Sequence, residues 1–327
     1  MGILPTKSSI PAQYLHEYNI VVFGEAGVGK TSFAVQPENS VLIQFEDGAK
    51  GLSCYKVNLI EKAKEKYGDE YKQHVWTMFQ KTIQELLKDD HSFEYVALDS
   101  IDRAYDSRME HYKGKKGYHP GGKKDDFGQS WNEFNSGFKD EFYKLMESSL
   151  GLINISHATT KAIEDVRGDK YDKIVPAAGG KMGQWLIDEA DIVLFYDRDI
   201  EGNRVLRVES DGNYEAKQRL PFQNEVIPAG NSSQETFNNF KKEFELAIIN
   251  RNKELGITEE MIEEHYAAKK EKKLLKNILK EIKKAIKTSD IKTEQAAEII
   301  QEKYGVNKLS ELNLQQAKKY LEYMKKQ

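Results

Sequence analysis

The sequence predicts an α/β core with a mainly parallel sheet and an antiparallel edge hairpin, followed by a small all-α C-terminal module. Short apolar runs alternate with helix-length segments from about residue 18 to residue 222, as in chains built from strand–helix–strand units. From residue 258 onward the patterns are helical and rich in Lys and Glu. We therefore expect an N-terminal segment at 1–17, a core at 18–250 and a helical module at 251–327.

Strands are predicted where short runs are almost entirely apolar, because a strand covered on both faces of a sheet has no polar side. The runs of this kind are Ile20–Phe23, Val41–Phe45, Tyr95–Asp99, Leu152–Ser156 and Ile192–Tyr196. Helix-length segments separate most of them, which favours parallel pairing through crossover connections.

Two further runs, Arg204–Glu209 and Tyr214–Arg219, stand close together near the end of the core. Ser210–Asn213 joins them, and its Asp-Gly step is typical of a tight turn. We expect these two runs to pair with each other as an antiparallel hairpin at one edge of the sheet.

The C-terminal module is predicted to be helical with a core of its own. Lys269–Lys287 sets leucines and isoleucines, from Leu274 to Ile286, on one face of a helix with lysines around it. Ile291–Tyr304 and Leu314–Met324 predict two shorter helices against which this face can pack. The lysine-rich surface suits DNA or an acidic tail of a partner protein, and it equally suits a plain solvated face.

Composition excludes several classes of protein. The 327 residues carry a formal net charge of −4, which argues against a histone-like binder but leaves room for a local basic patch. A single cysteine, Cys54, rules out a disulfide framework and suits a reducing cytosol. The first residues lack the apolar stretch of a signal peptide, and no run reaches the length of a membrane span. We expect a cytoplasmic protein without membrane contact.

A phosphate-binding P-loop is the strongest motif in the chain. The motif G-x-x-x-x-G-K-[ST] is matched by Gly24, Glu25, Ala26, Gly27, Val28, Gly29, Lys30 and Thr31, and Ser32 follows within a helix opening. In such a loop backbone N–H groups surround the phosphates, the Lys reaches the β- and γ-phosphates, and the Thr hydroxyl binds Mg²⁺. ATP and Mg²⁺ are the expected cofactors. A Gly-rich turn with an incidental Lys would leave the flanking strand and helix unexplained.

Polar residues end several of the predicted strands. Asp99 follows an apolar run one crossover after the P-loop, which favours a Walker B strand whose carboxylate binds the Mg²⁺ water shell. The run after the P-loop helix ends in Glu46 and Asp47, and Leu152–Ser156 ends in His157. Lys217 and Arg219 lie two residues apart on a predicted strand and therefore point to the same side.

Basic and aromatic residues mix in the segment after His157. The glycines at positions 168, 179 and 180 predict that this segment is a pliable loop. Its candidate DNA-binding residues are Lys161, Arg167, Lys170, Tyr171 and Lys173. Cations suit backbone phosphates and an aromatic ring suits an unpaired base, so we expect contact with single-stranded DNA. Tyr112–Lys124 is a second stretch of this kind, for which a disordered, solvated loop is an equal alternative.

Taken together, these motifs resemble those of the phage-encoded RecA-like ATPases of the Sak type. The resemblance covers about residues 15 to 222 and rests on Gly24–Thr31, Val41–Gly48, Tyr95–Ser100, Ile155–His157, Val166–Tyr171 and Lys217–Arg219. It implies a minimal RecA-like core, ATP-dependent binding of single-stranded DNA, and strand annealing or recombination with a phage single-strand-binding protein as partner.

The resemblance also implies roles for individual residues. Glu46, with Asp47 as second choice, would polarise the attacking water, and His157 would sense the γ-phosphate. Lys217 and Arg219 would reach the nucleotide of a neighbouring subunit in a homo-oligomer, either a ring or a filament. The plain structural alternatives are a solvated acidic turn at Glu46, a strand-capping His157 and an edge strand protected by lysine.

Two other functions use the same motifs. A helicase-type motor or helicase loader would couple the core to unwinding, whereas an ATP-gated adaptor would bind a protein partner and turn over poorly. Stimulation of ATP hydrolysis by single-stranded DNA separates the adaptor from the other two, and ATP-dependent unwinding identifies the helicase.

Overall fold

The computed structural model describes residues 4, 8–88, 90–122, 127–164, 167–179, 181–288 and 293–324. The chain divides into two compact units: Ala12–Arg251, and Asn252–Gln327 together with the N-terminal residues up to Pro11. Of the expected N-terminal segment 1–17, Leu15 is buried in the core of the first unit, next to Tyr18.

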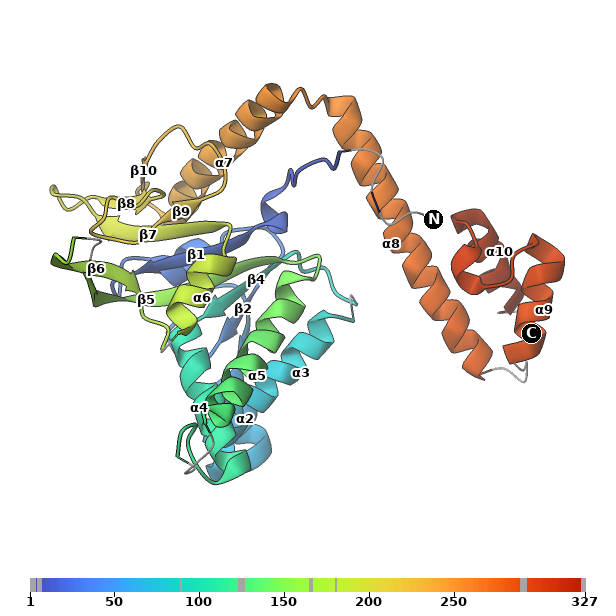
Figure 1. Cartoon of the computed structure of the whole chain (residues 1–327), viewed down its shortest axis with the longest axis horizontal. Coiled ribbons are helices and arrows are strands. Elements are labelled where there is room, and N and C mark those ends of the chain that lie inside the picture. The colour runs from blue at the N-terminus through green and yellow to red at the C-terminus, as the bar shows by residue number, and fades with distance from the viewer. Residues whose placement is uncertain are drawn as a thin grey trace. The chain divides into compact units, whose positions relative to one another are not determined.

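A parallel sheet forms the centre of the first unit, with strands in the order β7-β1-β5-β4-β2-β3 (Figure 1). Its strands are β1 Asn19–Gly24, β2 Ser40–Gln44, β3 Tyr55–Asn58, β4 Tyr95–Asp99, β5 Gly151–Glu164 and β7 Ile192–Arg198. The predicted apolar runs lie in these strands, which confirms the α/β core. Strand β3 was not predicted because its first half is exposed and it carries no apolar run.

Helices cover both faces of this sheet, and side chains that alternate along β1 serve the two sides. Val21 and Phe23 pack toward α2 Leu59–Tyr67, α3 Val75–Leu86, α4 Ile101–Lys116, α5 Gln129–Met146 and α6 Met182–Glu189, with η2 Gly68–His74 between α2 and α3. Ile20 and Val22 pack toward η1 Leu15–Glu17, α1 Lys30–Ala34 and α7 Ser233–Leu255. The sheet is therefore buried on both sides, as its apolar strands require.

The edge beyond β7 is antiparallel, as predicted, but the pairing differs. Strand β8 (Arg204–Arg207) pairs with β7 through the turn at 199–203, and β10 (Val226–Pro228) pairs with β8. The second predicted hairpin strand is reduced to β9 (Lys217–Gln218), which pairs with the start of β7 and not with β8. The segment with the turn expected at Ser210–Asn213 thus links β8 and β9, which both pair with the edge of β7 opposite β1.

The segment after His157 is a two-stranded ribbon and not the pliable loop that was predicted. Strand β5 continues beyond the parallel sheet, and its residues from Ala158 to Glu164 pair antiparallel with β6 (Lys170–Pro176). Charged residues interrupt the alternation of apolar and polar residues in this segment, so the sequence did not indicate that β5 continues or that β6 forms. Predicted residues Val166 and Gly180 lie outside the described residues.

The second unit is helical, which confirms the predicted all-α module. It contains α8 Glu259–Thr288, α9 Thr293–Tyr304, η3 Leu309–Glu311 and α10 Leu314–Met324. Ile278 and Ile282 of α8 are buried against Ile300 of α9 and Tyr320 of α10, so the unit has its own apolar core. Among the described helices, α8 included, none is long and apolar enough to cross a membrane.

Candidate active site

The P-loop runs from the end of β1 to the start of α1, and two of its glycines are required by geometry. A Cβ on Gly24 would lie 2.1 Å from the carbonyl oxygen of Tyr196 in the neighbouring strand β7, so only glycine fits there. Gly29 has a φ of +118°, a conformation that residues with a side chain rarely adopt. These glycines turn the chain sharply enough to bring Lys30 back over the loop.

Lys30 is buried within this loop, with 7% of its surface exposed. Its Nζ donates hydrogen bonds to the carbonyl oxygens of Gly24 at 2.9 Å and Glu25 at 2.8 Å. Burial lowers the pKa of Lys30, and the carboxylate of Asp99 is the largest opposing influence. A phosphate would offer this ammonium a charged acceptor, which makes a stronger hydrogen bond than a carbonyl.

Thr31 and Asp99 meet beside Lys30. The Thr31 hydroxyl donates to Asp99 Oδ2 at 2.9 Å, although the residues lie on α1 and at the end of β4. Burial raises the pKa of Asp99, and the hydrogen bond from Thr31 opposes that shift. Hard oxygen donors of this kind suit Mg²⁺, which binds through one or two protein groups together with phosphate and water oxygens. The described residues hold no cluster of three or more His, Cys, Asp or Glu side chains that would bind a metal unaided.

Glu46 follows β2 and turns toward the same edge of the sheet. Its Oε2 accepts a hydrogen bond from Arg103 Nε at 3.2 Å, and its Oε1 lies 3.9 Å from Nε2 of His157. The neighbouring Asp47 instead forms an exposed ion pair with Lys50 at 2.8 Å. Of the two acidic candidates, Glu46 is therefore the one that the fold brings together with His157.

Sequence reasoning missed two residues at this edge, Asp102 and Arg103, both in the first turn of α4. Asp102 Oδ2 accepts a hydrogen bond from His157 Nδ1 at 2.6 Å, and its Oδ1 accepts one from the His157 backbone N–H at 3.2 Å. Their position three and four residues after Asp99 could have marked them. An acidic residue in a first helical turn is, however, ordinarily attributed to the helix terminus.

The model of a known family matches residues 16–220, more than half of the chain, and its description is AAA domain. The chain belongs to the AAA domain family. The match indicates an AAA-type P-loop ATPase, in agreement with the loop, Lys30 and the Thr31–Asp99 pair. No curated protein matches the chain in sequence.

The two-stranded ribbon formed by β5 and β6 lies within this AAA domain, and its predicted DNA-binding residues are divided between its two faces. Residues 158–176 contain four cationic and four acidic side chains, so the ribbon has no net charge. Lys161 is opposite Lys173, and Ile163 is opposite Tyr171, which places these four on one face. Glu164, Lys170 and Asp172 occupy the other face, so the acidic strand residues are kept away from Tyr171.

Three of the predicted cations already have partners. Lys173 forms an ion pair with Glu215 at 2.8 Å, and Lys170 lies 3.9 Å from Glu164. Arg167 stands at the turn and also has an interaction within the chain. Lys161 has no ion pair among the described residues, and the Tyr171 ring is 40% exposed. On the face that Lys161, Ile163, Tyr171 and Lys173 share, Lys161 and Tyr171 are therefore the predicted residues that are open to a ligand.

The second basic stretch, Tyr112–Lys124, is in part helical. Helix α4 extends to Lys116, and Tyr112 is only 2% exposed because it packs against Tyr118 and Phe134. Its ring is thus unavailable for stacking on a base. Lys123 and Lys124 lie outside the described residues.

Lys217 and Arg219 lie at the opposite end of β7 from the P-loop of their own chain. Lys217 pairs with Val193 near the start of β7, whereas Tyr196 pairs with Gly24. Lys217 Nζ donates to the carbonyl oxygens of residues 187 and 188 at 2.8 and 2.9 Å. Arg219 donates to Asp191 Oδ1 at 2.9 Å and to the residue 188 carbonyl at 3.2 Å. Both cations therefore point to the same side, toward the C-terminal end of α6.

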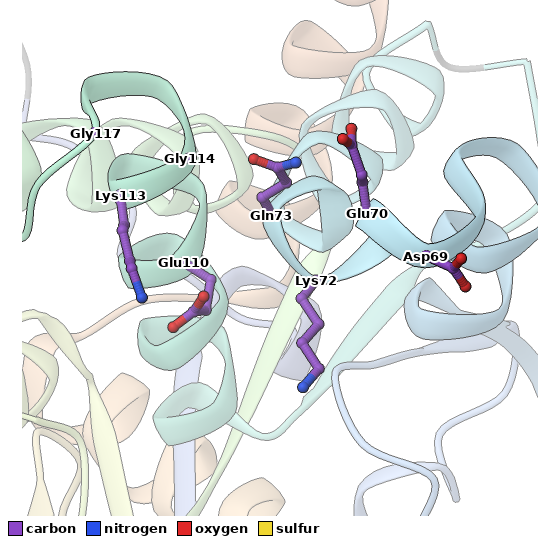
Figure 2. A pocket seen from close by; sticks show the side chains of 8 residues that line it. All are labelled: Asp69, Glu70, Lys72, Gln73, Glu110, Lys113, Gly114 and Gly117. Atoms are coloured by element: carbon purple, nitrogen blue, oxygen red, sulfur yellow. The ribbon is translucent and has the colours of Figure 1, made fainter.

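A surface pocket of about 350 Å³ lies between η2 and the C-terminal part of α4 (Figure 2). Asp69, Glu70, Lys72 and Gln73 line it from η2, opposite Glu110, Lys113 and Gly114 of α4 and Gly117 just after that helix. A Cβ on Gly114 would come within 2.2 Å of the Gln73 side chain, so glycine permits this close approach. The pocket lies several helical turns along α4 from Asp102 and is separate from the P-loop site.

Proposed function

We propose that this protein hydrolyses ATP with Mg²⁺ and uses the nucleotide to act on single-stranded DNA, promoting strand annealing or recombination in phage replication. The observation that carries the proposal is the meeting of Lys30, the Thr31–Asp99 pair and Glu46 at the carboxyl ends of β1, β2 and β4. Parallel α/β sheets bind their ligands at that edge.

Each of these groups has a separate task in phosphoryl transfer. Lys30 would exchange its two carbonyl partners for the β- and γ-phosphates and stabilise the charge that develops there. Thr31 and Asp99 would hold Mg²⁺, which neutralises phosphate charge when it is bound. Glu46 would polarise the water that attacks the γ-phosphate.

The ribbon is the proposed DNA-binding element, and its face with Lys161 and Tyr171 is the side we assign to the strand. One cation and one exposed ring suit a phosphate and a neighbouring base. Since the ribbon has no net charge, few phosphates are neutralised, and stacking should supply a large share of the affinity.

His157 supplies a route from the nucleotide to the ribbon. Strand β5 passes without interruption from the parallel sheet into the ribbon, and His157 is the residue at the junction. The His157 carbonyl accepts a hydrogen bond at 2.8 Å from the N–H of Ala177, just after β6. A movement of His157 on meeting the γ-phosphate would therefore reach both strands of the ribbon at their base.

The proposal includes a homo-oligomer, a ring or filament in which Lys217 and Arg219 serve the nucleotide of a neighbouring subunit. Their position at the far end of β7 from their own P-loop favours action in trans. A phage single-strand-binding protein is the proposed protein partner, and the lysine-rich helix α8 is a candidate surface for it.

The deciding experiment is ATP turnover by the full chain with and without a single-stranded oligonucleotide. The Lys30→Ala variant, prepared in the same way, measures the background turnover from contaminating ATPases. We expect turnover that rises with the oligonucleotide, together with annealing of complementary strands. Turnover without stimulation would favour the ATP-gated adaptor, and ATP-dependent unwinding of a forked duplex would favour the helicase-type motor.

A further inference from the structure

We infer that Asp102 is a positioning residue for His157: it holds the imidazole so that Nε2 and a carboxylate oxygen of Glu46 can both contact one oxygen atom placed beside them. This inference rests on the proposed ATP hydrolysis at the same edge of the sheet. It adds a residue that no motif marks, and it explains why the histidine at the junction of the parallel sheet and the ribbon is fixed in one orientation.

Asp102 accepts two hydrogen bonds from His157. Its Oδ2 accepts from the ring Nδ1 at 2.6 Å and its Oδ1 accepts from the His157 backbone N–H at 3.2 Å, so both ring and main chain are held. The carboxylate is itself fixed by the first turn of α4 and by a hydrogen bond from the Ser100 hydroxyl at 3.2 Å. Rotation of the ring would break the shorter of these contacts.

The charge state of Asp102 decides which ring nitrogen carries a proton. Burial acts to raise the pKa of Asp102, but the hydrogen bond from the His157 ring, the electrostatic interaction with His157 and two backbone hydrogen bonds together outweigh burial, and the net shift is downward. An ionised carboxylate can only accept hydrogen bonds. Nδ1 must therefore be the donor, and Nε2 is the nitrogen left to meet a ligand.

The space beyond Nε2 is limited by Glu46. Its Oε1 lies 3.9 Å from Nε2, which is too long for a direct hydrogen bond. An oxygen atom about 2.8 Å from both groups would lie to one side of the line that joins them, and a water or a phosphate oxygen placed there would contact both. Arg103 donates a hydrogen bond to the other Glu46 oxygen at 3.2 Å, so both Glu46 and His157 have a partner that orients them.

Replacing Asp102 by Asn tests the inference because the amide keeps the shape but can donate as well as accept, so it no longer dictates the tautomer. We expect Asp102→Asn to lower kcat by about 10- to 100-fold, the usual cost of losing a group that orients a functional histidine. The KM for ATP should change less than twofold. Asp140→Asn removes an exposed carboxylate on α5 and is the matched control, with unchanged kcat.

A double-mutant cycle distinguishes positioning from a general structural role. If Asp102 acts through His157, adding Asp102→Asn to His157→Gln should lower kcat no further. Multiplicative losses in the double variant would overturn the inference, as would a loss of kcat in Asp140→Asn equal to that in Asp102→Asn.

A second measurement is independent of ATP turnover. In the nucleotide-free protein, ¹⁵N NMR of the histidine rings, assigned with His157→Gln, should show the proton of His157 on Nδ1, and Asp102→Asn should shift that signal. An unprotonated Nδ1 in the wild-type chain would overturn the inference. A wild-type chain that shows this signal but no ATP hydrolysis would contradict the proposed function and leave the positioning by Asp102 standing.

Discussion

At the scale of single residues, the nucleotide site holds its charges with partners that a nucleotide can replace. Lys30 is satisfied by two carbonyl oxygens, and the Thr31 hydroxyl is satisfied by Asp99. Such contacts keep a buried ammonium and a buried carboxylate from standing unpaired, which would be costly. They also keep these groups where phosphate and Mg²⁺ would need them.

The first prediction concerns Lys30. Lys30→Ala removes the buried cation of the P-loop, and we expect ATP turnover to fall by at least about 100-fold, the typical cost of losing one electrostatic stabiliser of a transition state. Nucleotide affinity, measured by titration with a fluorescent ATP analogue, should weaken as well. Turnover close to that of the wild type would contradict the assignment of the P-loop as the hydrolytic site.

The second prediction separates binding from hydrolysis at Glu46. Glu46→Gln preserves size and hydrogen bonding to Arg103 but removes the charge that polarises water, so ATP should bind with unchanged affinity while turnover is lost. Asp47→Asn is the matched control, because Asp47 pairs with exposed Lys50. Loss of turnover in the Asp47 variant alone would move the carboxylate role to that residue.

At the scale of elements, the strands that cross the buried centre of the sheet could be predicted and the marginal ones could not. Strands β1, β2, β4 and the first half of β5 are apolar on both faces, and that pattern is distinctive. Strands β3 and β10 are short, with mostly exposed or half-buried residues, so they depend on backbone pairing that leaves little trace in composition.

The candidate site was predictable to the same extent. The P-loop, Asp99 and Glu46 could be found because each ends a recognisable strand or matches a fixed spacing. Asp102 could not be assigned to His157, since the two residues are 55 positions apart in the chain and meet only once β4 and β5 are neighbours. The ribbon was missed for a related reason: its pairing depends on a turn within a charged segment.

The third prediction concerns the ribbon and follows from its two faces. Lys161→Gln and Tyr171→Ala change the face that is open to a ligand, and Lys170→Gln changes the opposite face. We expect Tyr171→Ala to weaken binding to single-stranded DNA by about 1–3 kcal/mol through lost stacking. Lys161→Gln should flatten the slope of log affinity against log salt by about 0.7, the value for one phosphate contact.

Fluorescence anisotropy with a labelled oligothymidine over a range of salt concentrations measures both effects. Lys170→Gln is the control and should leave the affinity within twofold, because Lys170 lies beside Glu164 on the other face. Equal losses in all three variants would indicate that DNA is not confined to one face of the ribbon, and no loss in any would exclude the ribbon as the DNA site.

At the scale of the whole molecule, the fourth prediction is that hydrolysis needs contact between subunits. A chain with Lys217→Ala and Arg219→Ala retains its P-loop and Glu46, whereas a chain with Glu46→Gln retains Lys217 and Arg219. Each variant alone should be inactive. Mixed in equal amounts, they should recover part of the activity at interfaces that join an intact Glu46 to an intact Arg219.

Mass photometry of the mixture, with one variant enlarged by a fusion tag, would establish that mixed assemblies form. No recovery in such assemblies would show that Lys217 and Arg219 act within their own chain. Their contacts with the carbonyl at residue 188 and with Asp191 would then be their function, since cations stabilise the C-terminal end of a helix.

The last prediction concerns the border between the two units. Arg251 donates to the Tyr18 hydroxyl at 2.8 Å and to the Ala12 carbonyl at 2.6 Å, and α7 continues to Leu255. A chain that ends after Leu255 keeps these contacts and the buried phenylalanines of α7, so it should remain folded and retain basal ATP turnover. A chain that ends after Asn250 loses both hydrogen bonds of the guanidinium and should unfold more easily by about 2–4 kcal/mol.

Chemical denaturation followed by tryptophan fluorescence compares the two truncations with the full chain, since the core contains Trp76 and Trp185. If the chain ending at Leu255 keeps its stability and turnover but anneals DNA poorly, the helical unit supplies DNA or partner binding. If it instead unfolds, residues after 255 contribute to the stability of the core, and the division of the chain at Arg251 does not describe two independent folding units.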